Sequence, residues 1–324
     1  MPVINRIAEF HDDMTKWRRD LHAHPETAFE EKRTSDIVAA KLQEFGITVH
    51  RGLAGTGVVG TLSTGAGPSI GLRADLDALD VEELNDFAHK STYDGKMHAC
   101  GHDGHTTMLL GAAKYLAETK NFKGTVQFIF QPAEENEGGG RVMVEEGLFD
   151  LFPVEAVYGM HNMPGYELGA FCVMEGPLMA AFDIFELTIR GRGAHAAMPH
   201  TGIDPIPVAA EIIGALQTIV SRATNPSDAA VVTVTQVHAG QAWNVIPDEV
   251  ILRGTTRAFT PEVQDTLEPS IRRIAAGICQ AHDCQMEMMY ERRYPPTINE
   301  AQATKAAARA AADVTGAERV NHNP

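Results

Sequence analysis

The stretch MHACGHDGH, residues 97–105, carries a thiol, three imidazoles and a carboxylate within nine residues, and the fold is organised around it. Cys100 and His102 are two positions apart and cannot share one helical face, but both can point at one ion from a turn. Apolar residues recur at helical spacing after Met108, and Thr106 or Thr107 is a suitable N-cap. We predict a metal site in a turn that leads into a helix. A glycine-rich turn that carries histidines by chance is the alternative.

Length and charge limit the classes of protein to which this chain can belong. A chain of 324 residues exceeds the usual size of one domain, so two domains are expected. The formal net charge is -16, from 27 basic and 43 acidic residues. This negative charge opposes binding to the phosphate backbones of nucleic acids, so we predict no nucleic-acid partner.

The termini and cysteines point to a cytoplasmic protein. The N-terminus has no charged segment followed by an apolar core, and no stretch of apolar residues approaches a membrane-spanning length. The four cysteines are too few and too irregularly spaced for a disulfide framework. We therefore expect a cytoplasmic protein with no membrane partner.

Helices and strands alternate over the first half of the chain, which predicts an α/β domain with a central mixed sheet flanked by helices. The expected helices span residues 4–21, 30–45, 106–118 and 141–149, and the expected strands span 57–62, 69–77, 124–131 and 154–160.

Polar side chains follow three of these expected strands. Asp75 and Asp77 end one strand, Glu134 and Glu135 follow the next, and His161 follows the last. Strand ends commonly carry functional groups in such sheets. One glutamate can bind a metal while the other takes a proton from water. Turn carboxylates, a solvated acidic loop and an ordinary histidine are the alternatives.

A second pattern begins near residue 180. A strand at 182–190, a helix at 205–221, strands at 229–237 and 245–259, a helix at 261–281 and a strand at 285–290 follow one another. This βαββαβ order is typical of a ferredoxin-like sandwich. We predict an inserted α+β domain at residues 180–291, with residues 1–179 and 292–324 forming the first domain.

The order of motifs resembles the M20 metallopeptidase family, specifically its amidohydrolase branch of hippurate hydrolases, N-acyl-amino-acid deacetylases and auxin-conjugate hydrolases. The motifs that carry the resemblance are WRRDLH at 17–22, HPE at 24–26, LRAD at 72–75, CGHDGH at 100–105, QPAEE at 131–135, YGMHN at 158–162, GRGAHAAMPH at 191–200 and NVIPD at 244–248.

The resemblance implies a two-metal catalytic domain and an inserted lid domain that forms a homodimer. It implies that the metal ligands are Cys100, His102, Glu135 and His161. Glu134 would be the general base and His195 an oxyanion donor, and Asn244 and Arg257 would bind the carboxylate of the substrate. Asp75 would support the metals from outside the ligand set, because Arg73 stands where other branches place a ligand histidine. For Arg257 a surface ion pair is the alternative.

The function implied is a metal-dependent amidohydrolase that cleaves N-acetyl or N-benzoyl amino acids. The donor set suits two divalent ions, Zn, Mn, Co or Ni. The family also implies a further C-terminal portion with a last histidine ligand. We interpret the closing His322-Asn323-Pro324 as a chance match and expect a truncated catalytic domain. A dipeptidase or aminopeptidase, and an inactive dimeric metal-binding module, are the alternative functions.

Overall fold

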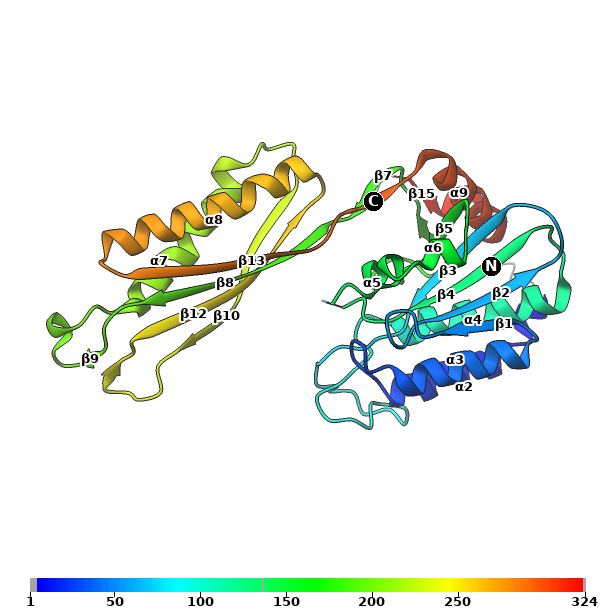
Figure 1. Ribbon diagram of the computed structural model, residues 1–324, viewed down its shortest axis with the longest axis horizontal. Coiled ribbons are helices and arrows are strands. Elements are labelled where there is room, and N and C mark those ends of the chain that lie inside the picture. The colour runs from blue at the N-terminus through cyan, green and yellow to red at the C-terminus, as the bar shows by residue number, and fades with distance from the viewer. Residues whose placement is uncertain (1–4, 136, 323–324) are drawn as a thin grey trace. The chain divides into compact units, whose positions relative to one another are not determined.

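The computed structural model describes residues 5–135 and 137–322, which form two compact units (Figure 1). One unit comprises the chain up to Cys172 together with Lys305–Asn321, and the other comprises Val173–Thr304 with His322. The second unit is wider than the predicted insertion at 180–291. It includes strands β7 (Gly176–Met179) and β14 (Thr297–Asn299), which pair with each other in antiparallel orientation.

The first unit is built on a five-stranded mixed sheet with the order β1-β2-β4-β3-β5. β3, β4 and β5 run parallel, whereas β1 and β2 add antiparallel neighbours at one edge. The strands are β1 (Thr48–Arg51), β2 (Val58–Ser63), β3 (Ser69–Asp75), β4 (Thr125–Gln131) and β5 (Ala156–Gly159). The predicted central mixed sheet is confirmed.

Helices cover both faces of this sheet (Figure 1). Neighbouring strand residues point to opposite faces, and Phe128 and Ile129 of β4 accordingly enter different cores. Helices α3 and α4 pack into the core that holds Phe128, and α5 and α6 into the core that holds Ile129. The helices are α1 (Asn5–Ala8), α2 (His11–Ala23), α3 (Lys32–Glu44), α4 (His102–Thr119), α5 (Gly139–Glu145) and α6 (Leu148–Leu151).

Two expected helices are each divided in the structure. The predicted helix at 4–21 consists of α1 and α2, and Ile4 lies outside the described residues. The predicted helix at 141–149 is interrupted at Gly147, which has a φ of 92°. Only glycine adopts this left-handed conformation without strain, so the residue ends α5 and begins α6.

The second unit has the predicted βαββαβ order. Its four-stranded antiparallel sheet has the order β10-β12-β8-β13, which is the ferredoxin-like arrangement. Helices α7 and α8 pack on one face through a core that includes Phe185, Leu187, Ile212 and Leu267. The elements are β8 (Ala181–Arg190), α7 (Pro205–Thr218), β10 (Ala230–Ala239), β12 (Glu249–Ala258), α8 (Pro261–Ala281) and β13 (Gln285–Tyr294).

Short elements complete the two units. The predicted strand at 245–259 breaks at Pro247-Asp248 into β11 (Val245–Ile246) and β12, and β11 pairs with β9 (Ala194–His195). Near the end of the chain, α9 (Ala301–Thr315) precedes β15 (Val320–Asn321), which pairs with β6 (Phe171–Cys172). The His322 Nδ1 lies 3.0 Å from the Val173 carbonyl oxygen, whereas Asn323 and Pro324 lie outside the described residues.

One helical segment, Pro205–Ala223, is long and apolar enough to span a membrane by length and composition alone. The expectation that no apolar stretch approaches a spanning length is therefore wrong. The segment carries only Glu211 and Arg222 as charged residues. One side of it, with Val208, Ile212 and Leu216, is buried in the core of the second unit, as in the core helix of a globular domain.

Candidate metal centre

Three parallel strands bring the predicted residues of the first unit to one edge of the sheet. Asp75 is the last residue of β3, Glu134 and Glu135 follow β4, and His161 follows β5. Because parallel strands point the same way, their carboxyl ends share an edge. His102, at the start of α4, lies at the same edge. Ligand atoms of Glu134, Glu135 and His102 all lie within 4.8 Å of one another.

His102 is the first residue of α4, and the predicted start of this helix after a longer turn is wrong. Gly101 has a φ of 91° and reverses the chain just before the helix, so the helix begins four residues before Thr106. The Thr106 hydroxyl donates to the Asp75 carbonyl oxygen at 2.8 Å and does not cap the helix. Of the two ligands predicted in this stretch, Cys100 lies in the turn and His102 lies in the helix.

Cys100 and His161 face each other across the site. The Cys100 Sγ lies 3.3 Å from the His161 Nε2. The His161 Nδ1 lies 2.6 Å from the carbonyl oxygen of Asn162, which accepts its hydrogen. The Nε2 lone pair is then directed at the thiol, and this tautomer is the one that a metal-binding histidine needs.

His102 is oriented by a carboxylate. Its Nδ1 lies 3.2 Å from the Asp77 Oδ1, and its buried Nε2 has no hydrogen-bond partner among the described residues. The Nε2 is 3.7 Å from the Asp75 Oδ2 and 3.9 Å from the Glu135 Oε1. A buried nitrogen without a partner costs free energy. A metal ion would satisfy it, so the residues present fit a metal.

Asp77 organises two predicted ligands together. Besides the contact with His102, its Oδ2 accepts a hydrogen bond from the Glu135 backbone N–H at 2.8 Å. The sequence places Asp77 at a strand end where functional groups are common, with a turn carboxylate as the alternative, and assigns it no contact with a metal ligand. Asp77 lies two residues after Asp75, the last residue of β3, and this position is the sequence feature that suggests a functional role. The contact with His102 depends on the tertiary structure.

A strained turn directs the two glutamates away from β4. Ala133 has a φ of 51°, which is uncommon for a residue with a Cβ. Its N–H donates to the fully buried Glu31 at 2.8 Å, and the same carboxylate accepts from the Thr56 hydroxyl at 2.6 Å. Burial raises the pKa of Glu31. This turn explains how adjacent residues, Glu134 and Glu135, both reach one site.

Asp75 is held by two partners beside the ligand cluster. It lies 2.7 Å from the Arg73 Nη1 and 2.7 Å from the His105 Nδ1. The second nitrogen of His105 accepts from the Asn162 N–H at 2.9 Å, so both of its ring nitrogens are engaged. Burial raises the pKa of Asp75, but the His105 hydrogen bond and the Arg73 charge outweigh it and hold the pKa well below its usual range.

The cluster favours an added positive charge. Burial lowers the pKa of His102, but the hydrogen bond to Asp77, the nearby Cys100 thiol and the charge of Asp75 raise it to about 11. Burial raises the pKa of Glu134, against the opposing charge of Arg73. The carboxylates therefore stabilise a cation at this position, as expected of a metal site before its ion is bound.

The second unit holds the other three predicted residues. His195 and Asn244 lie close together: β9 pairs with β11, and the Ala196 N–H donates to the Asn244 carbonyl oxygen at 2.9 Å. Arg257 lies near the end of β12 and pairs across the sheet with Phe182, the second residue of β8. Because His195 lies beyond the last residue of β8, Arg257 and His195 are at opposite ends of this sheet.

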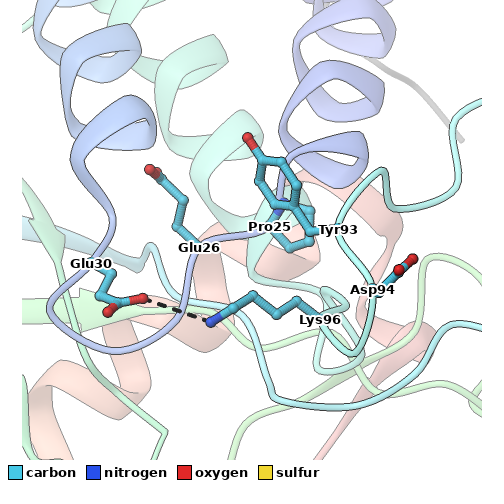
Figure 2. Close-up of a pocket in the computed structure, with 6 residues that line it drawn as sticks. All are labelled: Pro25, Glu26, Glu30, Tyr93, Asp94 and Lys96. Carbon is cyan, nitrogen blue, oxygen red and sulfur yellow. Dashed lines mark ion pairs between the residues drawn. The ribbon is translucent and has the colours of Figure 1, made fainter.

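A cavity of about 200 Å³ in the first unit is lined by Pro25, Glu26, Glu30, Tyr93, Asp94 and Lys96 (Figure 2). Glu26, Glu30 and Lys96 of this lining are engaged within the protein. Glu26 accepts from the Arg33 and Thr34 backbone N–H groups, and the Lys96 ammonium lies 3.7 Å from Glu30. None of the predicted site residues lines this cavity.

A model of the peptidase family M20/M25/M40 matches residues 71–324, well over half of the chain. The chain belongs to this family. Among M20 relatives, the hippurate hydrolase of Campylobacter jejuni is 41% identical over 327 residues, covering 100% of this chain and 85% of that protein. The N-acetylcysteine deacetylase of Bacillus subtilis is 42% identical over 306 residues, covering 94% and 80%.

The fold is that of solved M20 proteins. A Bacillus subtilis protein described as a dinuclear metal-binding peptidase of the M20 family superposes with a TM-score of 0.76 and 38% identity, over 98% of this chain and 84% of that chain. The family predicted from the order of the motifs is confirmed. The roles of individual residues stay predictions, to which the geometry above adds physical support.

Proposed function

We propose that this M20 protein is a metal-dependent amidohydrolase that cleaves N-acetyl or N-benzoyl amino acids to a carboxylate and a free amino acid. The observation that carries the proposal is the position of His102, whose buried Nε2 has no hydrogen-bond partner among the described residues. His102 lies in one cluster with Cys100 and His161 and in another with the adjacent Glu134 and Glu135. The relatives with 41% and 42% identity are named for hydrolysis of acylated amino acids.

The donor set supports two divalent ions. Cys100, His102, Glu135 and His161 would hold them, and Asp75 and Asp77 would supply charge and orientation around these ligands. The thiolate favours Zn, Co or Ni, whereas the carboxylates also admit Mn. When bound, such ions lower the pKa of water and polarise an amide carbonyl.

Glu134 is the proton carrier in this proposal. It accepts a proton from the attacking water and delivers it to the nitrogen of the leaving amino acid, so the amide C–N bond breaks as the new C–O bond persists. Its placement one residue before Glu135, after the Ala133 turn, keeps the carboxylate within 4.8 Å of the ligand atoms of His102 and Glu135.

His195 and Asn244 would bind the reacting carbonyl and the substrate, and Arg257 would bind the substrate carboxylate. Phe182 and Arg190 of β8 are eight residues apart, which corresponds to about 26 Å along a strand. One small substrate cannot contact residues at both ends of this sheet. A second copy of the chain would supply His195, and this supports a homodimer formed through the second unit. The cytoplasmic location stays a prediction from the sequence.

Hybrid dimers test this arrangement. We expect a mixture of the Glu134→Gln and His195→Ala variants, refolded or co-expressed together, to recover about a quarter of the wild-type rate, because half of the dimers would be hybrids with one intact site each. Each variant alone should be inactive. Absence of recovery, with hybrid dimers demonstrated by differential tags, would place His195 in the same chain as Glu134.

A substrate panel tests the reaction class. The protein is loaded with Zn, Mn, Co or Ni and assayed against N-acetyl and N-benzoyl amino acids and against dipeptides with a free amine. We expect hydrolysis of the acylated compounds, abolished by a chelator and restored by metal. Cleavage of dipeptides alone would favour a dipeptidase or aminopeptidase, and no cleavage would favour a metal-binding module.

A further inference from the structure

Four side chains form a row across one end of the sheet in the second unit. Val231 of β10 pairs with Arg257 of β12, Arg257 pairs with Phe182 of β8, and Phe182 pairs with Tyr294 of β13. The neighbouring Asp183 is buried on the helix-covered face, where Gln264 of α8 donates to it at 2.8 Å. Because neighbouring strand residues alternate, the row lies on the face opposite the helices.

The guanidinium of Arg257 is fixed within this row. Its Cζ lies 4.2 Å from the centre of the Phe182 ring, and the Phe182 and Tyr294 rings are 5.3 Å apart. Its Nη1 donates to the Thr256 carbonyl oxygen at 3.0 Å and to the Thr255 hydroxyl. The ring contact sets the plane of the guanidinium, and the two hydrogen bonds set its rotation within that plane.

Arg257 differs from the other arginines on the same face. Arg253 pairs with Glu186 at 2.6 Å, and Arg190 pairs with Glu249 and Glu287. Arg257 has no ion pair within the described residues, and its Nε and Nη2 make no hydrogen bond there. The alternative that Arg257 forms a surface ion pair is therefore wrong for the described part of the chain.

The free edge of Arg257 suits a carboxylate. The side chain is half-buried, and burial lowers its pKa. A partly desolvated cation without a counter-ion is unfavourable, and an anion that binds it recovers this free energy. The Nε and Nη2 hydrogens are parallel donors that match the two oxygens of one carboxylate.

We propose that Phe182 is a positioning residue that holds Arg257 with its Nε and Nη2 edge presented to the α-carboxylate of the substrate. This inference rests on the proposed function, in which the substrate is an N-acyl amino acid. Phe182 acts through Arg257 and touches no reacting atom. It therefore affects binding of the carboxylate and leaves the chemical step unchanged.

The kinetic test compares Phe182→Leu with Phe182→Tyr. A cation–π contact contributes about 0.5–1 kcal/mol at exposed sites and more when desolvated. For Phe182→Leu we expect the KM for an N-acyl amino acid to rise about threefold to tenfold with kcat unchanged. Phe182→Tyr, which retains the ring, should keep the wild-type KM. The methyl ester of the same substrate lacks the carboxylate, so its KM should not respond to either substitution.

A matched control perturbs the neighbouring arginine. Glu186→Gln weakens the ion pair of Arg253 on the same face, and we expect no change in KM from it. If Phe182→Leu fails to fold, Phe182→Met replaces it. An equal rise in KM for the acid and its ester, or an unchanged KM for both in a folded variant, would overturn the positioning role.

A binding measurement separates this inference from the proposed function. The side-chain Nε–H resonance of Arg257, assigned with Arg257→Lys, is followed in metal-free protein titrated with N-benzoylglycine and then with its methyl ester. A shift with the acid alone, weakened in Phe182→Leu, supports the inference even if no substrate is hydrolysed. No shift with the acid, in a protein that hydrolyses it, contradicts the inference and leaves the proposed function standing.

Discussion

Asp77 influences the metal centre through two neighbours, because one oxygen orients His102 and the other accepts the Glu135 backbone N–H. Carboxylates that orient a ligating histidine raise metal affinity. We expect Asp77→Asn to weaken metal affinity by about tenfold to a hundredfold. Competition with a chromophoric chelator measures it. An unchanged affinity would show that Asp77 does not orient His102 for metal binding.

His22 gives the protein a stability that depends on pH. Its Nδ1 lies 2.9 Å from Asp103 and its Nε2 3.1 Å from Glu83. The Asp103 hydrogen bond raises the pKa of His22, burial opposes this, and the Glu83 hydrogen bond adds to the rise. A raised folded pKa means that the folded state binds the proton more tightly. The stabilisation is therefore complete below the unfolded pKa and lost as the pH rises through the folded pKa.

The variant His22→Gln tests this linkage. We expect the difference in unfolding free energy between wild type and variant to be larger at about pH 6 than at about pH 9. Urea unfolding at the two pH values measures it. A difference that is equal at both pH values would mean that His22 does not carry a proton between the two carboxylates.

At the scale of residues, the sequence predicts most of the ligand cluster because motif spacing and strand ends are both local features. His102 lies in one cluster with Cys100 and His161 and in a second with Glu134 and Glu135, and the ligand roles stay predictions. Asp77 and Glu31 were missed as organising groups. Their partners lie 25 to 102 residues away, and a carboxylate on a turn or before a helix gives no local sign of such contacts.

At the scale of elements, the turn at Gly101 joins the metal site to α4. A Cβ at this residue would lie 2.1 Å from the Asn162 Oδ1, and the φ of 91° is unfavourable for any other residue. We expect Gly101→Ala to destabilise the protein by about 1–3 kcal/mol and to weaken metal binding. Denaturant unfolding and metal titration measure the two effects.

Gly55 provides a control for the backbone contribution alone. It has a φ of 78°, but a Cβ there would meet nothing within 4 Å. We expect Gly55→Ala to lower stability less and to leave metal affinity unchanged. If both variants lower stability equally and neither changes metal affinity, the contact between Gly101 and Asn162 has no role in the site.

Strong periodicity predicted the long helices and the buried strands, whereas boundaries and edges depended on tertiary structure. Strand β1 was not predicted, because none of its residues is fully buried and it lacks an apolar pattern. The early start of α4 depends on a left-handed Gly101 that no periodicity reveals.

At the scale of the whole molecule, the candidate metal ligands and the candidate substrate-binding residues belong to different units. The metal cluster belongs to the first unit, and His195, Asn244 and Arg257 belong to the second. Within the second unit these three residues lie at two opposite ends of one sheet. The order of helices and strands in the sequence predicted the folds of the two units. The separation of His195 from Arg257 follows from the strand register, which the spacing of these residues along the sequence does not reveal.

We propose that Glu134 transfers the proton in metal-dependent hydrolysis of an N-acyl amino acid. The direct test measures bound metal and the rate of N-benzoylglycine or N-acetyl amino acid hydrolysis in wild type and Glu134→Gln. We predict equal metal content and a loss in rate of at least about a hundredfold in the variant. A Glu134→Gln protein that keeps both its metal and the wild-type rate would show that Glu134 is not the proton carrier.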